Sequence, residues 1–255
     1  MIATIDVPAD GAYFEGHFPG RPILPGVAEL ALAVDALARE AGRPLALRGI
    51  AFARLRQLVF PGDRLELSAR KVDGARLRID LKRGGEPVAN AELILGMPAE
   101  VCGDMIAPMT SIGAESGFTE FDELLPHRAP MQFLVSILRE TDDGLDCMAR
   151  IPQTCALVAD ASAPPVAAVE AAAQAAAAWE ALRRSRVAGV ASPRVGYLVA
   201  LRDIAFHTGS VPAERDLLVS VRLDAATPPL THYRMQVSLD GKSVTRGMIA
   251  TFLTT

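Results

Sequence analysis

Apolar residues follow two different spacings in the first hundred residues of the chain. Between residues 27 and 41, Val, Leu and Ala recur at the three- and four-residue intervals of a helix with one buried face, which predicts a helix over 27–41. Segments with β-like alternation surround it, and turn residues such as Asp73-Gly74 and Gly84-Gly85 separate them. These segments predict strands at 1–7, 47–54, 57–60, 64–72, 75–82 and 87–95.

The second half of the chain repeats this order of elements. An alanine-rich run predicts a long helix over 163–182, buried on most of its circumference. A short helix is predicted at 118–125, and strands at 132–139, 144–151, 194–206, 216–224, 231–239 and 243–251. Between the halves, residues 97–117 have no period and are rich in Gly, Pro, Ser and Ala. We therefore expect one domain over 1–96, a linker over 97–117 and a second domain over 118–255.

A short internal repeat supports two copies of one domain. The hexapeptide Leu47-Arg48-Gly49-Ile50-Ala51-Phe52 matches residues 201–206 at five of six positions. The interval is far too long for a solenoid repeat, so tandem domains are the better interpretation. The expected fold class is α+β, with each domain a curled antiparallel sheet around a long central helix.

Composition narrows the function classes. The chain has 255 residues, of which 50% are hydrophobic and 22% charged, as in an ordinary globular protein. The net charge of −4 gives no electrostatic case for binding nucleic acid. Three cysteines without a C-x-x-C spacing indicate neither a disulfide framework nor a zinc site. Because the start of the chain has no signal-like segment, we expect a cytoplasmic protein. The alanine-rich run contains Glu170 and Glu180, so we expect no membrane span. We also expect no metal and no cofactor.

The segment 16–27 is the strongest candidate for chemistry. It places His17 on a loop stiffened by prolines and glycines, which opens at Pro25-Gly26 into the first predicted helix. A histidine in so constrained a loop, just before a helix N-terminus, is a candidate base. A structural histidine is the alternative.

This segment resembles the active-site segment of the β-hydroxyacyl-acyl-carrier-protein dehydratases, which have the hotdog fold. The resemblance implies a double hotdog in which the two domains form an internal pseudo-dimer. It also implies that His17 is catalytic and that the backbone N–H of Gly26 binds the thioester carbonyl. The remaining substrate-loop residues that it implies are Phe18, Pro19, Gly20 and Pro25.

In that family, a glutamate or aspartate lies fourteen residues after the histidine. Position 31 of this chain is Ala31, so the first half lacks the acid, and Glu29 should point away from the site that position 31 faces. In the second half, Glu170 followed by Gln174 resembles the family's acidic helix, but Ala156 stands where the histidine would be. Each half has therefore lost what the other retains.

The same count pairs Pro165, which has no N–H, with Gly26. We therefore expect one composite site from His17, Gly26 and Glu170, and an empty one where Ala31, Ala156 and Pro165 meet. An alanine-lined pocket should raise the pKa of Glu170 and suit it to act as an acid. The alternative for Glu170 is a buried carboxylate that caps a loop.

The remaining conspicuous side chains are given no chemistry. His127, in Leu125-Pro126-His127-Arg128, is expected to be structural, and Trp179 to belong to the core. His207 and His232 are assigned no role. A group of arginines could form a docking patch for an acidic carrier protein or simply face solvent, namely Arg21, Arg43, Arg48, Arg54 and Arg56.

The second half looks closest to the dehydratase-like hotdog proteins of aryl polyene biosynthesis, and the first half looks like their second dehydratase subunit. The chain thus looks like a fusion of two subunits. The expected reaction converts a 3-hydroxyacyl group on acyl carrier protein to the trans-2-enoyl form, in fatty acid or aryl polyene biosynthesis. The alternatives are a hotdog thioesterase and a non-catalytic carrier-binding or scaffold subunit. Association of pseudo-dimers into a homo-oligomer is left open.

Overall fold

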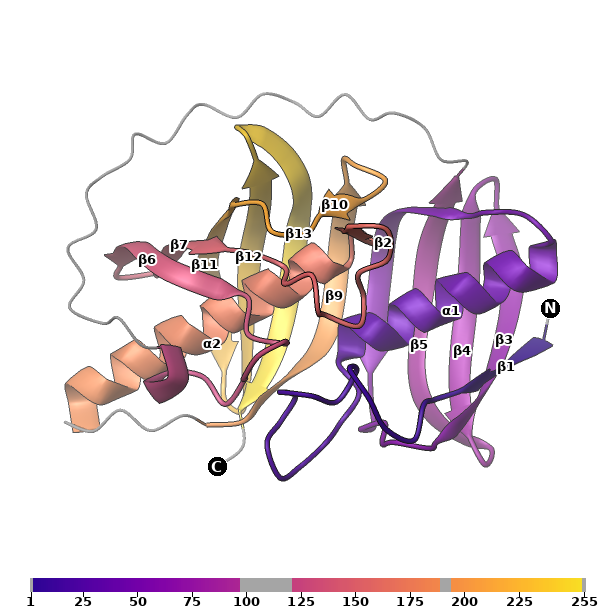
Figure 1. Cartoon of the computed structure of the whole chain (residues 1–255), viewed down its shortest axis with the longest axis horizontal. Coiled ribbons are helices and arrows are strands. Elements are labelled where there is room, and N and C mark those ends of the chain that lie inside the picture. The colour runs from indigo at the N-terminus through magenta and orange to yellow at the C-terminus, as the bar shows by residue number, and fades with distance from the viewer. Residues whose placement is uncertain (1, 97–120, 189–193, 254–255) are drawn as a thin grey trace.

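One antiparallel sheet with two helices on the same face forms the described part of the molecule (Figure 1). The computed structural model describes residues 2–96, 121–188 and 194–253. The predicted linker, 97–117, lies outside these residues. Within them, eleven strands join edge to edge in the order β1-β3-β4-β5-β2-β9-β13-β12-β11-β7-β6.

The first half supplies five of these strands and one helix. Its elements are β1 (Ile2–Asp6), α1 (Gly26–Ala41), β2 (Ala46–Leu55), β3 (Arg64–Asp73), β4 (Arg76–Arg83) and β5 (Glu86–Gly96). Helix α1 begins directly after Pro25 and ends where Gly42 adopts a left-handed conformation, with φ 61°. Its apolar face, including Val27 and Leu30, is fully buried beneath the sheet.

The strand predicted at 57–60 is absent from the fold. The backbone N–H groups of Arg56 and Gln57 both donate to the carbonyl of Val88, which ends the ladder. The carbonyl of Val59 then accepts from Leu24 in the loop before α1. The segment therefore ties the His17 loop to the sheet instead of extending the sheet.

The second half supplies the other six strands and the longer helix. Its elements are η1 (Phe121–Glu123), β6 (Leu134–Thr141), β7 (Gly144–Ala149), β8 (Ser162–Ala163), α2 (Ala167–Ala188), β9 (Gly196–Phe206), β10 (Val211–Pro212), β11 (Leu217–Thr227), β12 (Leu230–Leu239) and β13 (Lys242–Leu253). The helix begins four residues later than predicted because Pro164 and Pro165 precede it. Short β8 and β10, which the sequence did not indicate, pair only with each other.

The two halves meet along strands β2 and β9, which contain the repeated hexapeptide. Ile50 and Ile204 occupy the same position of the repeat and lie opposite each other in this antiparallel pair. Both side chains are buried. An interface in which equivalent positions meet is that of a two-fold dimer, so the chain is a pseudo-dimer of two domains.

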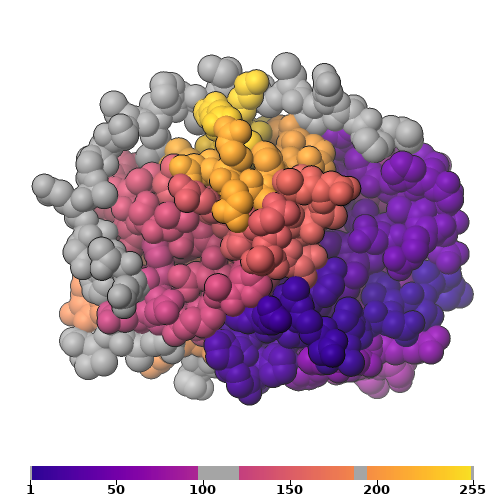
Figure 2. Space-filling view, in the orientation of Figure 1, coloured from indigo at the N-terminus to yellow at the C-terminus, as the bar shows by residue number. Residues whose placement is uncertain are grey.

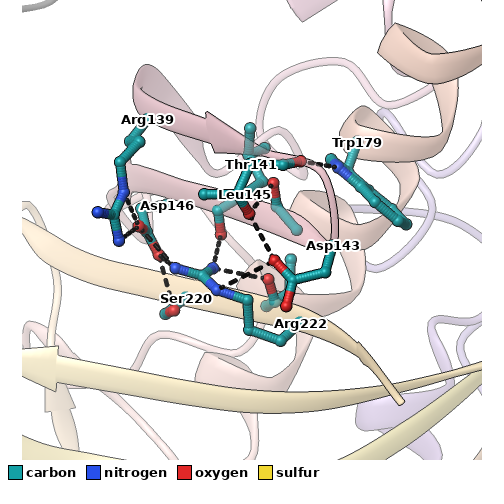
Figure 3. Close-up of polar contacts among 10 residues, drawn as sticks. Arg139, Thr141, Asp143, Leu145, Asp146, Trp179, Ser220 and Arg222 are labelled. Atoms are coloured by element: carbon teal, nitrogen blue, oxygen red, sulfur yellow. Dashed lines mark hydrogen bonds and ion pairs between the residues drawn. The ribbon is translucent and has the colours of Figure 1, made fainter.

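Polar contacts tie the outer strands of the second half to one another and to α2 (Figure 3). Asp146 on β7 is fully buried and pairs with Arg139 at 2.9 Å and with Arg222 at 2.7 Å. The indole N–H of Trp179 donates to the carbonyl of Thr141 at 3.1 Å. Trp179 is a core residue, as expected. Neither described helix has the length and apolar character needed to cross a bilayer.

Candidate active site

His17 lies on the loop between β1 and α1, with 7% of its surface exposed. Its Nδ1 is 3.0 Å from the carbonyl oxygen of Ile23. Because a carbonyl can only accept, Nδ1 carries the hydrogen and Nε2 keeps its lone pair. The ring of Phe18 stacks on the imidazole, with 4.1 Å between ring centroids. The loop thus fixes both the orientation and the tautomer of His17.

The electrostatics of His17 favour its neutral form. Burial lowers the pKa of His17 from 6.5 to about 4, although the charge of Glu170 opposes the shift. The imidazole is therefore unprotonated near neutral pH and can accept a proton.

The other predicted loop residues divide into two groups. Phe18 and Pro25 are buried, and the carbonyl of Pro25 accepts the first hydrogen bonds of α1, from Ala28 and Glu29. Pro19 and Gly20 are exposed at the tip of the loop. The structure thus exposes the tip of the loop and buries residues on either side of it.

Glu170 lies on the first turn of α2 and is 4% exposed. One helical turn later, Gln174 donates from Nε2 to Oε1 of Glu170 at 3.1 Å and to the carbonyl of Met131 at 2.7 Å. The amide oxygen of Gln174 accepts from the N–H of Phe133 at 2.9 Å. The glutamine four residues after the acid therefore ties the segment 131–133 to the helix and orients the carboxylate.

His127 also belongs to the site, which the sequence interpretation missed. Its Nε2 lies 3.3 Å from Oε1 of Glu170, and the ring is 6% exposed. The guanidinium of Arg128 donates to the carbonyls of Leu125 at 2.8 Å and His127 at 2.6 Å, which holds the loop in place. The Leu-Pro-His-Arg run was the available signal, but nothing in its spacing links it to a helix more than forty residues away.

The expectation of a raised pKa at Glu170 was wrong. Burial does act to raise it, but the hydrogen bond and charge of His127, with smaller contributions from His17 and Gln174, lower the pKa of Glu170 to about 2. The resting carboxylate is ionised. The His127–Glu170 pair can hold one proton between Nε2 and Oε1, as a buried hydrogen-bonded pair.

The two loops that carry the histidines touch directly. The N–H of Arg128 donates to the carbonyl of Gly16 at 3.0 Å. Gly16 has φ +76°, and a Cβ there would lie 1.9 Å from the carbonyl oxygen of Arg128. In the space-filling view, indigo residues of the first half lie against rose residues of the second (Figure 2). Glycine is therefore required where the halves bring their loops together.

This contact brings three titratable side chains to one place. Ligand atoms of His17, His127 and Glu170 all lie within 4.8 Å of one another. Two imidazoles and a carboxylate are of the types that bind zinc. The 3.3 Å contact between His127 and Glu170 can also be bridged by a shared proton, while Nδ1 of His127 is buried without a hydrogen-bond partner among the described residues.

These side chains line two neighbouring cavities. The first, of about 290 Å³, is lined by His17 and Gly26 from the first half and by Tyr197 and Leu198 from β9. The second, of about 600 Å³, begins at His127 and Glu170 and follows the face of α2 past Ala173 and Ala177. Leu198 lines both cavities.

The counterpart positions across the pseudo-two-fold axis carry no titratable side chain. Ala31 is buried on α1, Pro165 is buried just before α2, and Ala156 lies in the turn region before β8. Alanine or proline therefore stands at each of the three positions that the sequence count pairs with Glu170, His17 and Gly26.

Family comparisons agree with this geometry. Residues 119–255 match the family described as ApeP-like, ApeP dehydratase, and residues 1–90 match ApeI-like, ApeI dehydratase. The chain belongs to the ApeP-like dehydratases. Its first half carries the ApeI-like domain, as expected of a fusion of two dehydratase subunits.

Individual relatives point the same way. The chain is 38% identical over 107 residues to the 3-hydroxyacyl-[acyl-carrier-protein] dehydratase FabZ of Pelotomaculum thermopropionicum. The aligned region covers 38% of this chain and 76% of that protein. The dehydratase domain of RzxB from Pseudomonas fluorescens superposes with a TM-score of 0.69 at 17% identity, over 98% of this chain and 93% of that one.

A monomeric dehydratase domain from a trans AT polyketide synthase split module gives a TM-score of 0.71 at 14% identity, over 100% of this chain and 99% of that one. These two structural matches show the double hotdog fold across the whole ApeP-like chain.

Proposed function

We propose that this ApeP-like dehydratase removes water from a 3-hydroxyacyl group carried by acyl carrier protein, in a single site built from both halves. The observation that carries the proposal is the meeting of His17 and Glu170. The first half contributes a neutral imidazole, the second an ionised carboxylate paired with His127, and their ligand atoms lie within 4.8 Å.

The chemistry follows from these protonation states. Nε2 of His17 takes the acidic proton from the α-carbon of the thioester, while the N–H of Gly26 at the N-terminus of α1 stabilises the developing charge on the carbonyl oxygen. The β-hydroxyl leaves as water with the proton shared by His127 and Glu170, while Nδ1 of His127 keeps its own hydrogen, so the pair that remains is a neutral imidazole and a carboxylate. The proton on His17 then returns to that pair, so no net proton is gained or lost.

The cavities suggest how the substrate lies. The thioester belongs in the smaller cavity beside His17 and Gly26, and the acyl chain belongs in the larger one, along the alanine face of α2. Arg56 lines the smaller cavity and is exposed, and Arg21 is exposed over the ring of Tyr197. These cations stand where an acidic carrier protein would deliver its acyl group.

The decisive experiment incubates the whole chain with a 3-hydroxyacyl carrier protein and follows the mass of the acyl group. Wild type should lose water from the substrate, and His17→Ala and Glu170→Gln should each lower the rate by about 10²–10⁴-fold. His232→Ala, a change of an exposed histidine on β12, is the control and should retain wild-type activity.

Two results would overturn the proposal. If both site variants dehydrate as fast as wild type, His17 and Glu170 do not form the site. If wild type releases free acid and no enoyl product, the protein is a thioesterase.

A further inference from the structure

Glu29 is a buried acid that the proposed reaction leaves unused. It lies on the first turn of α1 with 3% of its surface exposed, and its Oε2 has no hydrogen-bond partner among the described residues. Because it follows Gly26 by three residues, it lies on the same face of the helix. Both residues line the smaller cavity together with His17.

A second unpartnered polar group belongs to a residue that lines the same cavity. The hydroxyl of Tyr197 is buried and, within the described residues, also lacks a hydrogen-bond partner. A buried polar atom without a partner costs stability, and most such atoms in native proteins are satisfied. Two of them around one cavity beside His17 indicate that a polar part of the substrate completes their hydrogen bonds.

We propose that Glu29 contacts the substrate, its carboxyl donating a hydrogen bond to the thioester carbonyl oxygen beside the backbone N–H of Gly26. This inference rests on the proposed dehydration. When His17 removes the α-proton, negative charge develops on that oxygen, and two donors would then stabilise it instead of one.

The surroundings of Glu29 keep its carboxyl in the donating form. Burial raises the pKa of Glu29 well above its usual value, and the charge of Arg83 opposes this only in part. Arg83 is engaged by Asp63 and by the side chain of Gln57. The other titratable groups on the cavity wall are His17, Arg56 and Tyr197. A neutral carboxylic acid held in an apolar site is a known way to donate a hydrogen bond to a developing oxyanion.

This placement also explains the position of Glu29 relative to Ala31. Two residues along a helix rotate a side chain by about 200°, so Glu29 faces away from the empty site and toward the working one. The acid lost at position 31 and the acid present at position 29 therefore serve opposite sides of α1.

The test uses the full chain and 3-hydroxyacyl carrier protein, with Glu29→Leu, Glu29→Gln and the control Asp35→Asn on an exposed position of the same helix. Glu29→Leu should lower kcat by about 100-fold with KM nearly unchanged, because one oxyanion donor is lost. It should also unfold at the same or a higher temperature than wild type. If Glu29 had only a structural role, Glu29→Leu would not lower kcat while leaving the unfolding temperature unchanged or higher.

Glu29→Gln keeps a donor and should retain kcat within about threefold. Because the raised pKa of Glu29 predicts that wild type will lose activity at alkaline pH as this carboxyl ionises, Glu29→Gln should lack that loss. This pH comparison remains available if Glu29→Leu fails to fold.

The outcomes separate the two proposals. If wild type does not dehydrate the substrate, the proposed function fails and the role of Glu29 falls with it. If wild type is active and Glu29→Leu folds and dehydrates within twofold of wild type, only the role of Glu29 is wrong. The same holds if Glu29→Gln keeps the alkaline loss of activity.

Discussion

Nε2 of His127 lies 3.3 Å from Oε1 of Glu170, with both side chains buried at the start of the larger cavity. The pair joins a loop and a helix of the second half, and it lies next to the histidine that the first half contributes. In the proposed reaction we therefore assign the acid to His127 and Glu170 together, because the lowered pKa of Glu170 leaves its carboxyl ionised.

Removing His127 should change the protonation of Glu170. In His127→Phe, the burial of Glu170 is no longer offset by its main partner, so the pKa of Glu170 should rise from about 2. We expect kcat to fall by about 10²-fold or more because Glu170 then has no imidazole with which to share the proton that the leaving hydroxyl needs. Dehydration rates measured between pH 4 and 9 check this. His232→Phe is the matched control, and an unchanged rate in His127→Phe would return His127 to a structural role.

Stability should fall as the solution is acidified. The pKa of His17 is lowered from 6.5 to about 4, so the unfolded chain binds a proton at this residue between these pH values while the folded chain does not. The pKa of Glu170 is lowered from 4.5 to about 2, which acts in the same direction at lower pH. Both contributions to stability are present near pH 7 and are lost as the pH falls.

Urea unfolding at pH 7, 5.5 and 4.5 measures this loss. The effect of His17 alone is on the order of 3 kcal/mol across its window. His17→Gln should therefore lose less stability than wild type between pH 7 and 4.5, whereas His232→Gln, at an exposed position, should behave as wild type. If all three proteins lose the same stability on acidification, the lowered pKa of His17 is not the cause of the loss.

Two glycines of the His17 loop should respond differently to the same substitution. Gly16 and Gly20 have φ +76° and +72°, but a Cβ at Gly16 meets the carbonyl of Arg128 whereas a Cβ at Gly20 meets nothing within 4 Å. Gly16→Ala should separate the two loops and lower kcat by about tenfold or more. Gly20→Ala carries the same backbone strain without the clash and should cost only stability. Dehydration rates and thermal unfolding of both variants test this prediction. If both variants lose the same activity, the contact between Gly16 and Arg128 is not needed for catalysis.

Inactive variants should not rescue each other. His17→Ala keeps an intact Glu170, and Glu170→Gln keeps an intact His17, but the two residues of one site lie in one chain. A mixture of the two proteins should therefore stay as inactive as either alone. Recovery of a substantial part of wild-type activity on mixing would show that sites form between chains.

The sequence predicted the elements well where apolar spacing sets them. The helix at 27–41 and most strands agree with the structure to within a few residues. The strand at 57–60 failed because Val59 bonds to the His17 loop, a long-range partner that alternation does not encode. The start of α2 shifted because Pro165 cannot donate within a helix.

The site was predictable to the extent that its motifs have fixed spacing. Counting from His17 to Ala31 and from Ala156 to Glu170 indicated which half supplies which group, and the structure brings His17 and Glu170 together. The roles of His127 and Glu29 could not be read in the same way. They depend on which side chains face a shared cavity, and this is a property of packing between distant segments.

Ile50 and Ile204 show that each half presents the same strand edge to its neighbour. Two copies of the first half could pair through that edge, and so could two copies of the second, but the first assembly would hold His17 without Glu170 and the second would hold Glu170 without His17. Only the mixed pair assembles His17 with Glu170. Because one polypeptide carries both halves, their ratio is fixed at one to one, and each first half is tethered to a second half as soon as the chain is made. This tether favours the pairing that contains both His17 and Glu170 over the inactive pairings of two identical halves.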